Sequence, residues 1–515
     1  MKVFRVLLIP LVFVAAAGST GARCDAPTGG GGGPGGIATA REAAMWTKAP
    51  APIWKQVDAL VDEQKMEAAS ELAGKALDDA RKAGDAAEVV RALVRVTQLR
   101  MALHGYETAV RFLKDQEWPD HPVARAVLDG FYAHALVTYG DMYSWEIRQR
   151  EEVASSSEVD LKAWTARQIR AAAQAALSDA WAQRQALGRL DVHAIPEFLD
   201  ANDYPAGIRP TLRDALTYLF AAFLDDSGDW TPAQSGDVYL LDVGELLADA
   251  RPAQDADLGP DRHPLQSLAA VLGDLEAWHR SRNEAGATLE ARLERIRRLH
   301  EHLEQDDDRA RLRDHLAKTL DGFRDDPWWS VGMALLAEHT RAEDAWDADA
   351  RAREIAERGR KAHPDSVGGR RCLHVVRAIE APEYGIEAMA SDAPDRRSIG
   401  VTSRNLERLH FRAWRVDPWA WIAQSDDYNL LPRGDELEAR LDRKPDHAWS
   451  VDLPVLPDFR AHRTWVVPPM GTPGLWIVAS SAAPGFGVAE NVRHAVPLVV
   501  GDLVLQRTVR ETEVS

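Results

Sequence analysis

Four histidines in the second half of the chain are the side chains best suited to bind a metal ion. They are His279, His300, His302 and His315. His300 and His302 flank a single glutamate, whereas the His-Glu-x-x-His motif places two ligands one helical turn apart. On an acidic helical surface a solvated histidine is far more common than a metal ligand. We therefore predict no metal site and expect solvated histidines.

Runs of acidic residues offer a second kind of candidate site. Asp306–Asp308 could contribute to a calcium site, but the run lacks the alternating ligands and central glycine of a calcium loop. The pairs Asp225–Asp226 and Asp325–Asp326 fall where helices are expected to end, so we interpret them as turn residues.

No stretch of the sequence supplies a nucleophile together with its base. Gly-x-Ser-x-Gly and Cys-x-x-Cys motifs are missing, and the run Gly29–Gly33 lacks the strand and helix that a phosphate-binding loop requires. We predict that the chain is not an enzyme and that it has no catalytic residues and no cofactor.

The two cysteines suggest different environments. A large exported protein with only Cys24 and Cys372 gains little from disulfide bonds. Cys24 follows a signal-like segment, where a lipid-anchored bacterial cysteine would lie, but Arg23 fits a lipidation motif poorly. A soluble exported chain is the preferred interpretation, and lipidation at Cys24 with a membrane anchor is the alternative.

The first residues resemble an export signal. Lys2 and Arg5 precede an apolar run that ends in small residues at Ala15–Ala17, which predicts a signal peptide over residues 1–17. Residues 18–44 contain a Gly-rich tract and form an expected flexible linker. We expect an exported protein of the periplasm or the extracellular space.

Length and charge restrict the remaining classes. A chain of 515 residues is too long for one ordinary core, so several domains are expected. The formal net charge of −18 and the lack of any Lys/Arg-rich run argue against a nucleic-acid partner.

Helical patterns fill residues 45–382, as one or two subdomains. Apolar residues recur at three- and four-residue steps, and Gly84-Asp85 and Gly105 mark helix ends. Paired helices at a spacing of about 30 to 40 residues are typical of helical-hairpin repeats. An irregular helical bundle is an equal alternative, because no repeat consensus is visible.

The pattern changes to strand over residues 396–511. Leu409, Phe411 and Ala413 alternate with charged neighbours, and Pro and Gly separate later apolar runs. This pattern predicts an antiparallel β-sandwich, with residues 418–445 as a long connection. Trp328–Trp329 and Trp419–Trp421 could be ligand platforms, but we expect buried anchors.

Several local patterns resemble the large bacterial alpha-2-macroglobulin family. The Arg209-Pro210-Thr211-Leu212 segment is similar to one in that family, and Ser403-Arg404-Asn405 is similar to its Tyr-Arg-Asn strand. Other matching segments follow in the family's order: Asp326–Trp329, His363–Ser366, Cys372, Ile379–Pro382, Leu453–Pro457, Pro468–Ala479 and Val499–Leu503. The last three resemble central and closing strands of a macroglobulin-like domain.

The resemblance implies the N-terminal part of such a protein, a helical region followed by its first macroglobulin-like β-domain. Full-length relatives are endopeptidase inhibitors that trap proteases through a cleavable bait region, often with a thioester at Cys-x-Glu-Gln. Neither cysteine here precedes Glu-Gln, so no thioester is expected. We expect a non-catalytic module that lacks the bait region, from a truncated or split chain. Arg209, Pro210, Thr211, Leu212, Arg404 and Asn405 would then have structural roles.

Two partner classes follow from these interpretations. A module of an inhibitor would contact proteases or the remaining macroglobulin domains of a split chain. The alternative is a stand-alone helical-repeat protein that mediates protein–protein interactions in the cell envelope.

Overall fold

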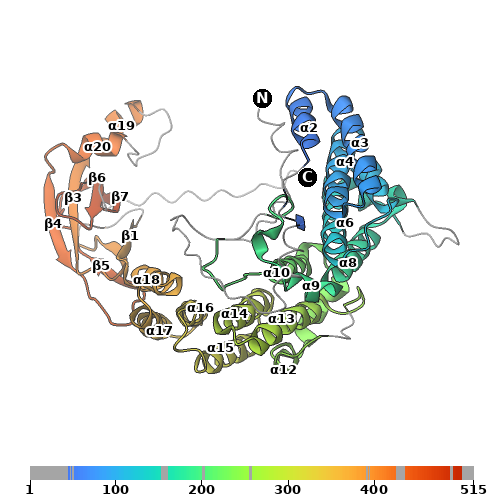
Figure 1. Cartoon of the computed structure of the whole chain (residues 1–515). Helices are drawn as coiled ribbons and strands as arrows, with labels where there is room; N and C mark the ends of the chain where they lie inside the picture. Colours follow the sequence, from blue (N-terminus) through green and yellow to red (C-terminus); the bar gives the residue numbers. More distant parts are fainter. Residues whose placement is uncertain are drawn as a thin grey trace, which may run out of the picture. The chain divides into compact units, whose positions relative to one another are not determined.

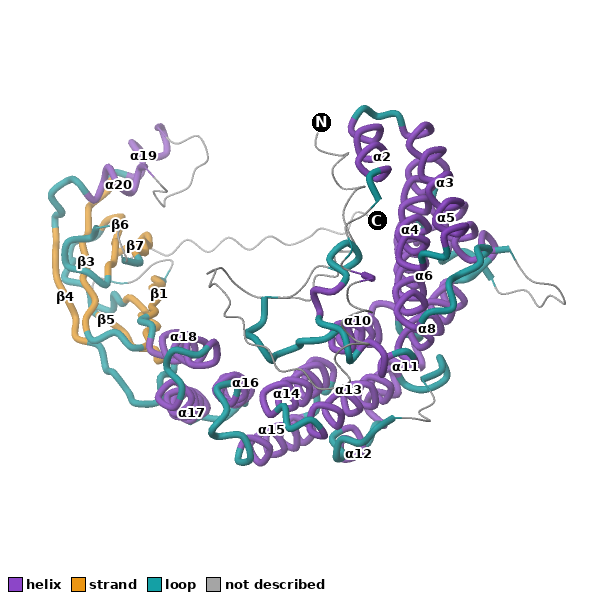
Figure 2. Tube along the Cα trace, viewed as in Figure 1, coloured by secondary structure: helices purple, strands orange, loops and turns teal. Residues whose placement is uncertain are grey.

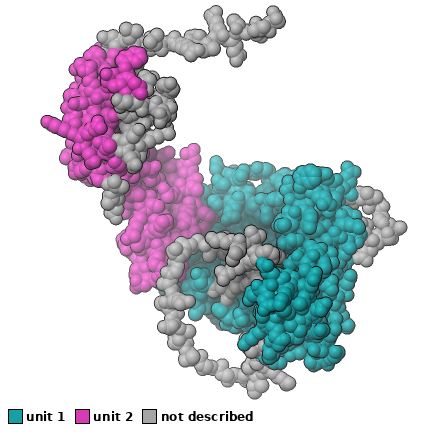
Figure 3. All heavy atoms as spheres, turned by 90° about the horizontal axis from the view of Figure 1, so that it is seen from above, with its two compact units in different colours: residues 1–332 teal, residues 333–515 magenta. Residues whose placement is uncertain are grey.

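The computed structural model describes most of the chain after its first 44 residues. Described are residues 45–46, 48, 51–151, 160–199, 203–253, 258–389, 393, 395–424, 435–487 and 491–501. The expected signal peptide, the Gly-rich segment and Cys24 lie outside the described residues. The chain divides into two compact units, Met1–Gly332 and Met333–Ser515, and the boundary falls within helix α16 (Trp329–Arg341) (Figure 3).

The first unit begins with consecutive helices that pack on their neighbours (Figure 1). They are α2 (Ile53–Asp62), α3 (Met66–Ala83), α4 (Ala86–His104), α5 (Tyr106–Lys114) and α6 (Pro122–Met142). Gly84 ends α3 in the left-handed region (φ 64°), and the carboxylate of Asp85 then accepts a hydrogen bond from the backbone N–H of Glu88 at the start of α4. Such short turns make successive helices antiparallel.

The unit continues with longer helices separated by short helical turns. These elements are α7 (Ser144–Ile147), η2 (Leu161–Ala163), α8 (Ala166–Ala182), α9 (Arg184–Leu187), η3 (Val192–Ala194), α10 (Leu212–Asp225), η4 (Ser227–Asp229), α11 (Pro232–Asp237), η5 (Val238–Leu240), α12 (Val243–Leu246), α13 (Pro264–Ser281), α14 (Ala285–His302) and α15 (Asp306–Leu320). Helix α8 packs along α6, and α13 packs against both α10 and α14. Among the described helices, none is long and apolar enough to cross a membrane.

The second unit contains the remaining described helices and all the described strands (Figure 2). Helix α17 (Ala348–Ala362) packs on α18 (Val367–Glu380), which the hydroxyl of Ser366 caps by accepting from the N–H of Gly369. The two helices approach closely at Gly359, where an added Cβ would lie 2.5 Å from the sulfur of Cys372. Burial raises the pKa of the Cys372 thiol to about 12.

Seven strands form two antiparallel sheets. The strands are β1 (Glu383–Ala388), β2 (Ile399–Arg404), β3 (Arg408–Val416), β4 (His447–Asp452), β5 (His462–Val466), β6 (Gly474–Ser481) and β7 (Arg493–Val500). One sheet has the order β1-β2-β5 and the other β4-β3-β6-β7. Both sheets contribute to one apolar core, which includes Val401, Phe411, Val478 and Leu498. The prediction of a mainly helical region followed by antiparallel strands is confirmed.

Some strand positions differ from expectation. Strand β1 begins at Glu383, before residue 396, where the β-region was expected to start. Tyr384, Ile386 and Ala388 alternate with polar neighbours and pack into the core, but the pattern is only six residues long. Because β1 pairs with β2, the stretch through Arg404 is the second strand. Leu453–Pro457, expected to be a central strand, is the loop after β4, because its two prolines cannot donate to a sheet.

The connection after β3 contains two short helices. They are α19 (Pro418–Gln424) and α20 (Asp435–Leu441). Trp419 is 79% exposed, so the expectation of a buried anchor is wrong for this residue. The carboxylate of Asp417 accepts from the N–H of Trp419 (2.9 Å), which starts a surface helix and directs the indole outward. Trp328, in contrast, is buried.

Candidate functional site

The Arg209–Leu212 segment turns the chain into α10. Arg209 has a left-handed backbone (φ 51°), and the N–H of Leu212 donates to the carbonyl of Leu190 (3.1 Å). Thr211 caps the helix: its hydroxyl donates to Oδ2 of Asp214 (2.6 Å), and the N–H of Asp214 donates back to Thr211 Oγ1 (3.4 Å). This reciprocal capping box fixes where α10 starts. The carbonyl of Pro210 accepts from Val192 (3.0 Å).

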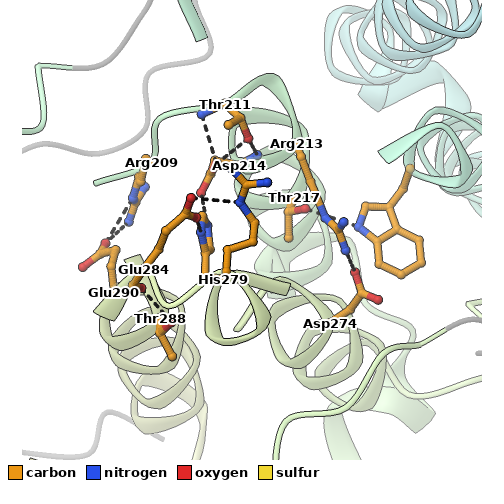
Figure 4. Close-up of polar contacts among 12 residues, drawn as sticks. Arg209, Thr211, Arg213, Asp214, Thr217, Asp274, His279, Glu284, Thr288 and Glu290 are labelled. Carbon is orange, nitrogen blue, oxygen red and sulfur yellow. Dashed lines mark hydrogen bonds and ion pairs between the residues drawn. The ribbon is translucent and has the colours of Figure 1, made fainter. Parts of the chain in front are cut away.

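Asp214 also connects α10 to α13. Its Oδ1 lies 2.8 Å from Nε2 of His279, and Nδ1 of His279 lies 2.7 Å from Oε2 of Glu284. Figure 4 shows Asp214 between Thr211 and His279. His279 has no exposed surface, so the expectation of a solvated histidine is wrong here. A buried imidazole needs polar partners at both nitrogens, and the two carboxylates supply them.

Arg209 forms a second part of the cluster with α14. Its Nε donates to Glu290 Oε1 (3.1 Å) and its Nη2 donates to Glu294 Oε2 (3.1 Å). The guanidinium also lies 3.6 Å from the centre of the Tyr218 ring, a cation–π contact. The indole of Trp328 donates to the other oxygen of Glu290 (2.7 Å).

Charge pairing keeps this part of the cluster ionised. Burial opposes the charge of Arg209, but Glu290, Tyr218, Glu294 and Tyr204 together outweigh it and raise the pKa of the guanidinium. Burial likewise opposes the charge of Glu294, yet Arg297, Arg209 and Arg298 lower its pKa to about 2. Buried charges are tolerated in this way only when paired and hydrogen-bonded.

A third part centres on Asp274 of α13. Its Oδ2 accepts from Arg213 (2.6 Å) and from Arg184 (3.1 Å), and its Oδ1 accepts from the N–H of Ala253 (2.9 Å). Arg213 also lies over the ring of Trp278 at 4.6 Å. We call these three parts together the buried polar cluster, and Figure 4 labels members of each part, among them Asp214, Arg209 and Asp274.

The geometry of the buried polar cluster suits support better than catalysis. The Thr211 hydroxyl donates to the carboxylate of Asp214 as part of the helix cap, and that carboxylate separates the hydroxyl from His279. Asp214 is 1% exposed and His279 is fully buried, which leaves no approach for a substrate. The cluster therefore fixes α10 against α13 and α14.

The other sequence candidates occupy simpler positions. Nε2 of His302 lies 2.9 Å from Asp225 at the end of α10, and Asp306–Asp308 form the first turn of α15. Burial, with Arg292 and Arg295 nearby, lowers the pKa of His315 to about 4. Within the described ranges, no group of three or more His, Cys, Asp and Glu side chains could hold a metal ion.

Asn405 joins the sheets to helix α18. Its backbone is left-handed (φ 52°), and its side-chain amide donates to the carbonyls of Ile379 (2.7 Å) and Ala381 (3.2 Å) at the end of α18. Arg404 donates from Nη2 to Glu383 across the β1–β2 pair (2.9 Å). The two residues thus hold the helix–sheet junction, and Arg404 also lines a cavity.

Two cavities lie near these motifs, one in each unit. In the first unit Leu212 lines a small apolar cavity of about 70 Å³ together with residues of α6, α8 and α10. In the second unit Arg404 lines a larger cavity of about 400 Å³ between the β1–β2 pair, α17 and the segment before β5. Only the larger cavity combines charged and apolar walls.

The sequence did not reveal most partners in the buried polar cluster. Asp274 and Glu276 interrupt an apolar stretch of α13, which is the one local signal of buried charge. The arginine partners of Asp274 come from distant segments, and His279 and Asp214 lie 65 residues apart. We compared the chain with protein-family models, with curated proteins and with solved structures, and none of these comparisons gave a match.

Proposed function

We propose that this chain is an exported, non-catalytic module of a macroglobulin-type endopeptidase inhibitor, contributing scaffold and partner contacts. The observation that carries the proposal is the second unit, where sheets of three and four antiparallel strands share one core directly after a helix. Seven antiparallel strands in two facing sheets are typical of sandwich modules of about 100 residues. A macroglobulin-like domain would have this architecture.

Side-chain chemistry supports a role without catalysis. The motif residues Arg209, Thr211 and Asn405 are used for capping and for buried contacts. Cys372 is buried and its pKa is raised to about 12, so its thiolate is scarce at neutral pH. Any action on a protease would therefore be non-covalent.

A protease assay tests the proposal. The purified chain is mixed with serine, cysteine and metalloproteases, and cleavage of a protein substrate is followed over time. We expect full protease activity and no covalent adduct, because this chain supplies neither bait nor thioester. Time-dependent trapping by this chain alone, or turnover of a substrate by it, would contradict the proposal.

A helical interaction protein of the cell envelope is the second candidate. It is favoured by Met142, Tyr143 and Trp145, which are exposed at the end of α6 and in α7, with Trp145 78% exposed. Exposed aromatic residues of this kind often dominate binding at protein interfaces. The test compares the envelope proteins that bind the parent chain, Trp145→Ala and, as the exposed control, Trp419→Ala. This second function would be favoured if only Trp145→Ala no longer bound a partner that is neither a protease nor a macroglobulin.

A further inference from the structure

The larger cavity lies on the outer face of the three-stranded sheet. Tyr384 and Ser403 are buried toward the core, so alternation places their strand neighbours Glu383, Gly385 and Arg404 on the opposite face. Asp349 of α17 and the segment Phe459, Arg460 and Ala461 complete the walls. A volume of about 400 Å³ is in the range of small-ligand sites.

Gly385 leaves the floor of this cavity open. A Cβ built there would meet no atom within 4 Å, although the residue lies within strand β1. Its cross-strand neighbour is Thr402, another small residue. The cavity therefore exists because the residues at 385 and 402 are small. A larger side chain at 385 would fill it without straining the backbone.

Arg404 supplies an unused donor to this cavity. Its side chain is 16% exposed and pairs through Nη2 with Glu383, whereas its Nε is buried and has no hydrogen-bond partner in the described part of the chain. A buried N–H without a partner is costly, and an anionic oxygen is its best acceptor. The exposed Arg460 lines the same cavity and adds a second guanidinium.

The acidic residues restrict which anion could bind. Glu383 pairs with Arg404, and Asp349 pairs with Arg341 (2.9 Å). Both carboxylates line the cavity, so a dianion such as a phosphate monoester would meet repulsion from them. A peptide with a single carboxylate also has backbone N–H groups, which can donate hydrogen bonds to Asp349 and Glu383. We infer that the cavity binds a short peptide segment of a partner protein through one carboxylate, which contacts Arg404 and Arg460. This inference does not rest on the proposed inhibitor function.

Calorimetric titration of the full chain with four pentapeptides tests the inference. The peptides have the same alanine–glycine backbone and carry a free C-terminal carboxylate, a C-terminal amide, a central Glu with both ends capped, or a central Gln with both ends capped. We expect at least one acid to bind about tenfold more tightly than its neutral match. Preference for the first peptide identifies a chain terminus as the ligand group, and preference for the third identifies an acidic side chain.

Two variants locate the binding. Gly385→Ile should abolish it by filling the floor, and Gly471→Ile, at an exposed glycine that also meets no atom within 4 Å, should leave it unchanged. Arg460→Ala, on an exposed residue, should weaken acid binding about tenfold while circular dichroism shows an intact fold. Equal binding of acidic and neutral peptides, no binding of any peptide, or unchanged binding by Gly385→Ile would overturn the inference.

Discussion

Single side chains decide whether the buried polar cluster stabilises the first unit. Arg209 neutralises Glu290 and Glu294, and all three lie in the interior. Breaking a buried pair leaves an uncompensated charge, which costs more than the pair contributed over an apolar alternative. The cluster is therefore sensitive to the loss of any one member.

Arg209→Met should lower the free energy of unfolding of the first unit by about 3–5 kcal/mol, because Glu290 loses its guanidinium partner while Glu294 keeps Arg297 and Arg298. Urea denaturation followed by circular dichroism measures this change. Arg324→Met is the matched control, since Arg324 pairs on the surface with Asp321, and it should change stability by less than about 0.5 kcal/mol. Equal effects of the two substitutions would show that the buried polar cluster does not stabilise the fold.

Asp129 gives a prediction for the pH dependence of stability. Burial, reinforced by the charge of Asp179, raises the pKa of Asp129 from 3.8 to about 7. Between these values the folded state holds a proton that the unfolded state releases, so stability falls as pH rises through this window.

Asp129→Asn should therefore stabilise the protein at pH 8, by about 1–2 kcal/mol, and should have little effect near pH 3.5. Thermal unfolding at both pH values measures this. A constant difference between variant and parent at the two pH values would exclude a perturbed Asp129.

At the scale of elements, Asn405 connects α18 to the sheets. Asn405→Ala removes two hydrogen bonds to helix-end carbonyls and puts alanine, which tolerates the left-handed region less well than asparagine, at a φ of 52°, so we expect a loss of about 2 kcal/mol. Asn405→Gly removes the same bonds without the backbone strain and should cost less. Urea titration of the second unit should rank parent, glycine and alanine in that order. A more stable alanine variant would contradict this role.

The crossing of α17 and α18 requires a glycine. Gly359→Ala should destabilise by about 1–3 kcal/mol, because the new Cβ would lie 2.5 Å from Cys372 Sγ and 2.8 Å from Met333 Cβ. Gly74→Ala in α3 meets no atom within 4 Å and should stabilise by about 0.5–1 kcal/mol. Thermal midpoints that shift in the same direction for both would refute the close crossing.

Much of the secondary structure could be predicted from sequence because its signals are local. Gly84 and Gly105 end helices, and Leu409, Phe411 and Ala413 alternate into the core of β3. The short strand β1 escaped prediction although Tyr384, Ile386 and Ala388 alternate with polar residues, because a pattern of six residues is a weak signal. A local sequence pattern indicates that a segment forms a strand, but it does not show which other strand that segment pairs with in the sheet.

The candidate sites were harder to predict because their members are far apart in sequence. His279 was expected on the surface, and only the fold brings it between Asp214 and Glu284. The cavity beside Arg404 depends on residues from β1, β2, α17 and the segment before β5. The spacing of these residues along the chain does not show that they lie close together in the folded protein.

At the scale of the whole molecule, we propose that the helical unit and the two-sheet unit serve to bind proteins. The net charge of −18 keeps it soluble and disfavours nucleic acid. The motif residues support the fold, which leaves exposed surfaces and the cavity at Arg404 for partners.

The central claim, a non-catalytic module of a macroglobulin-type inhibitor, is tested most directly by chemical crosslinking in the cell envelope followed by mass spectrometry. The proposal predicts crosslinks from this chain to a protease or to macroglobulin-type domains. Reproducible crosslinks only to proteins of neither kind would contradict it.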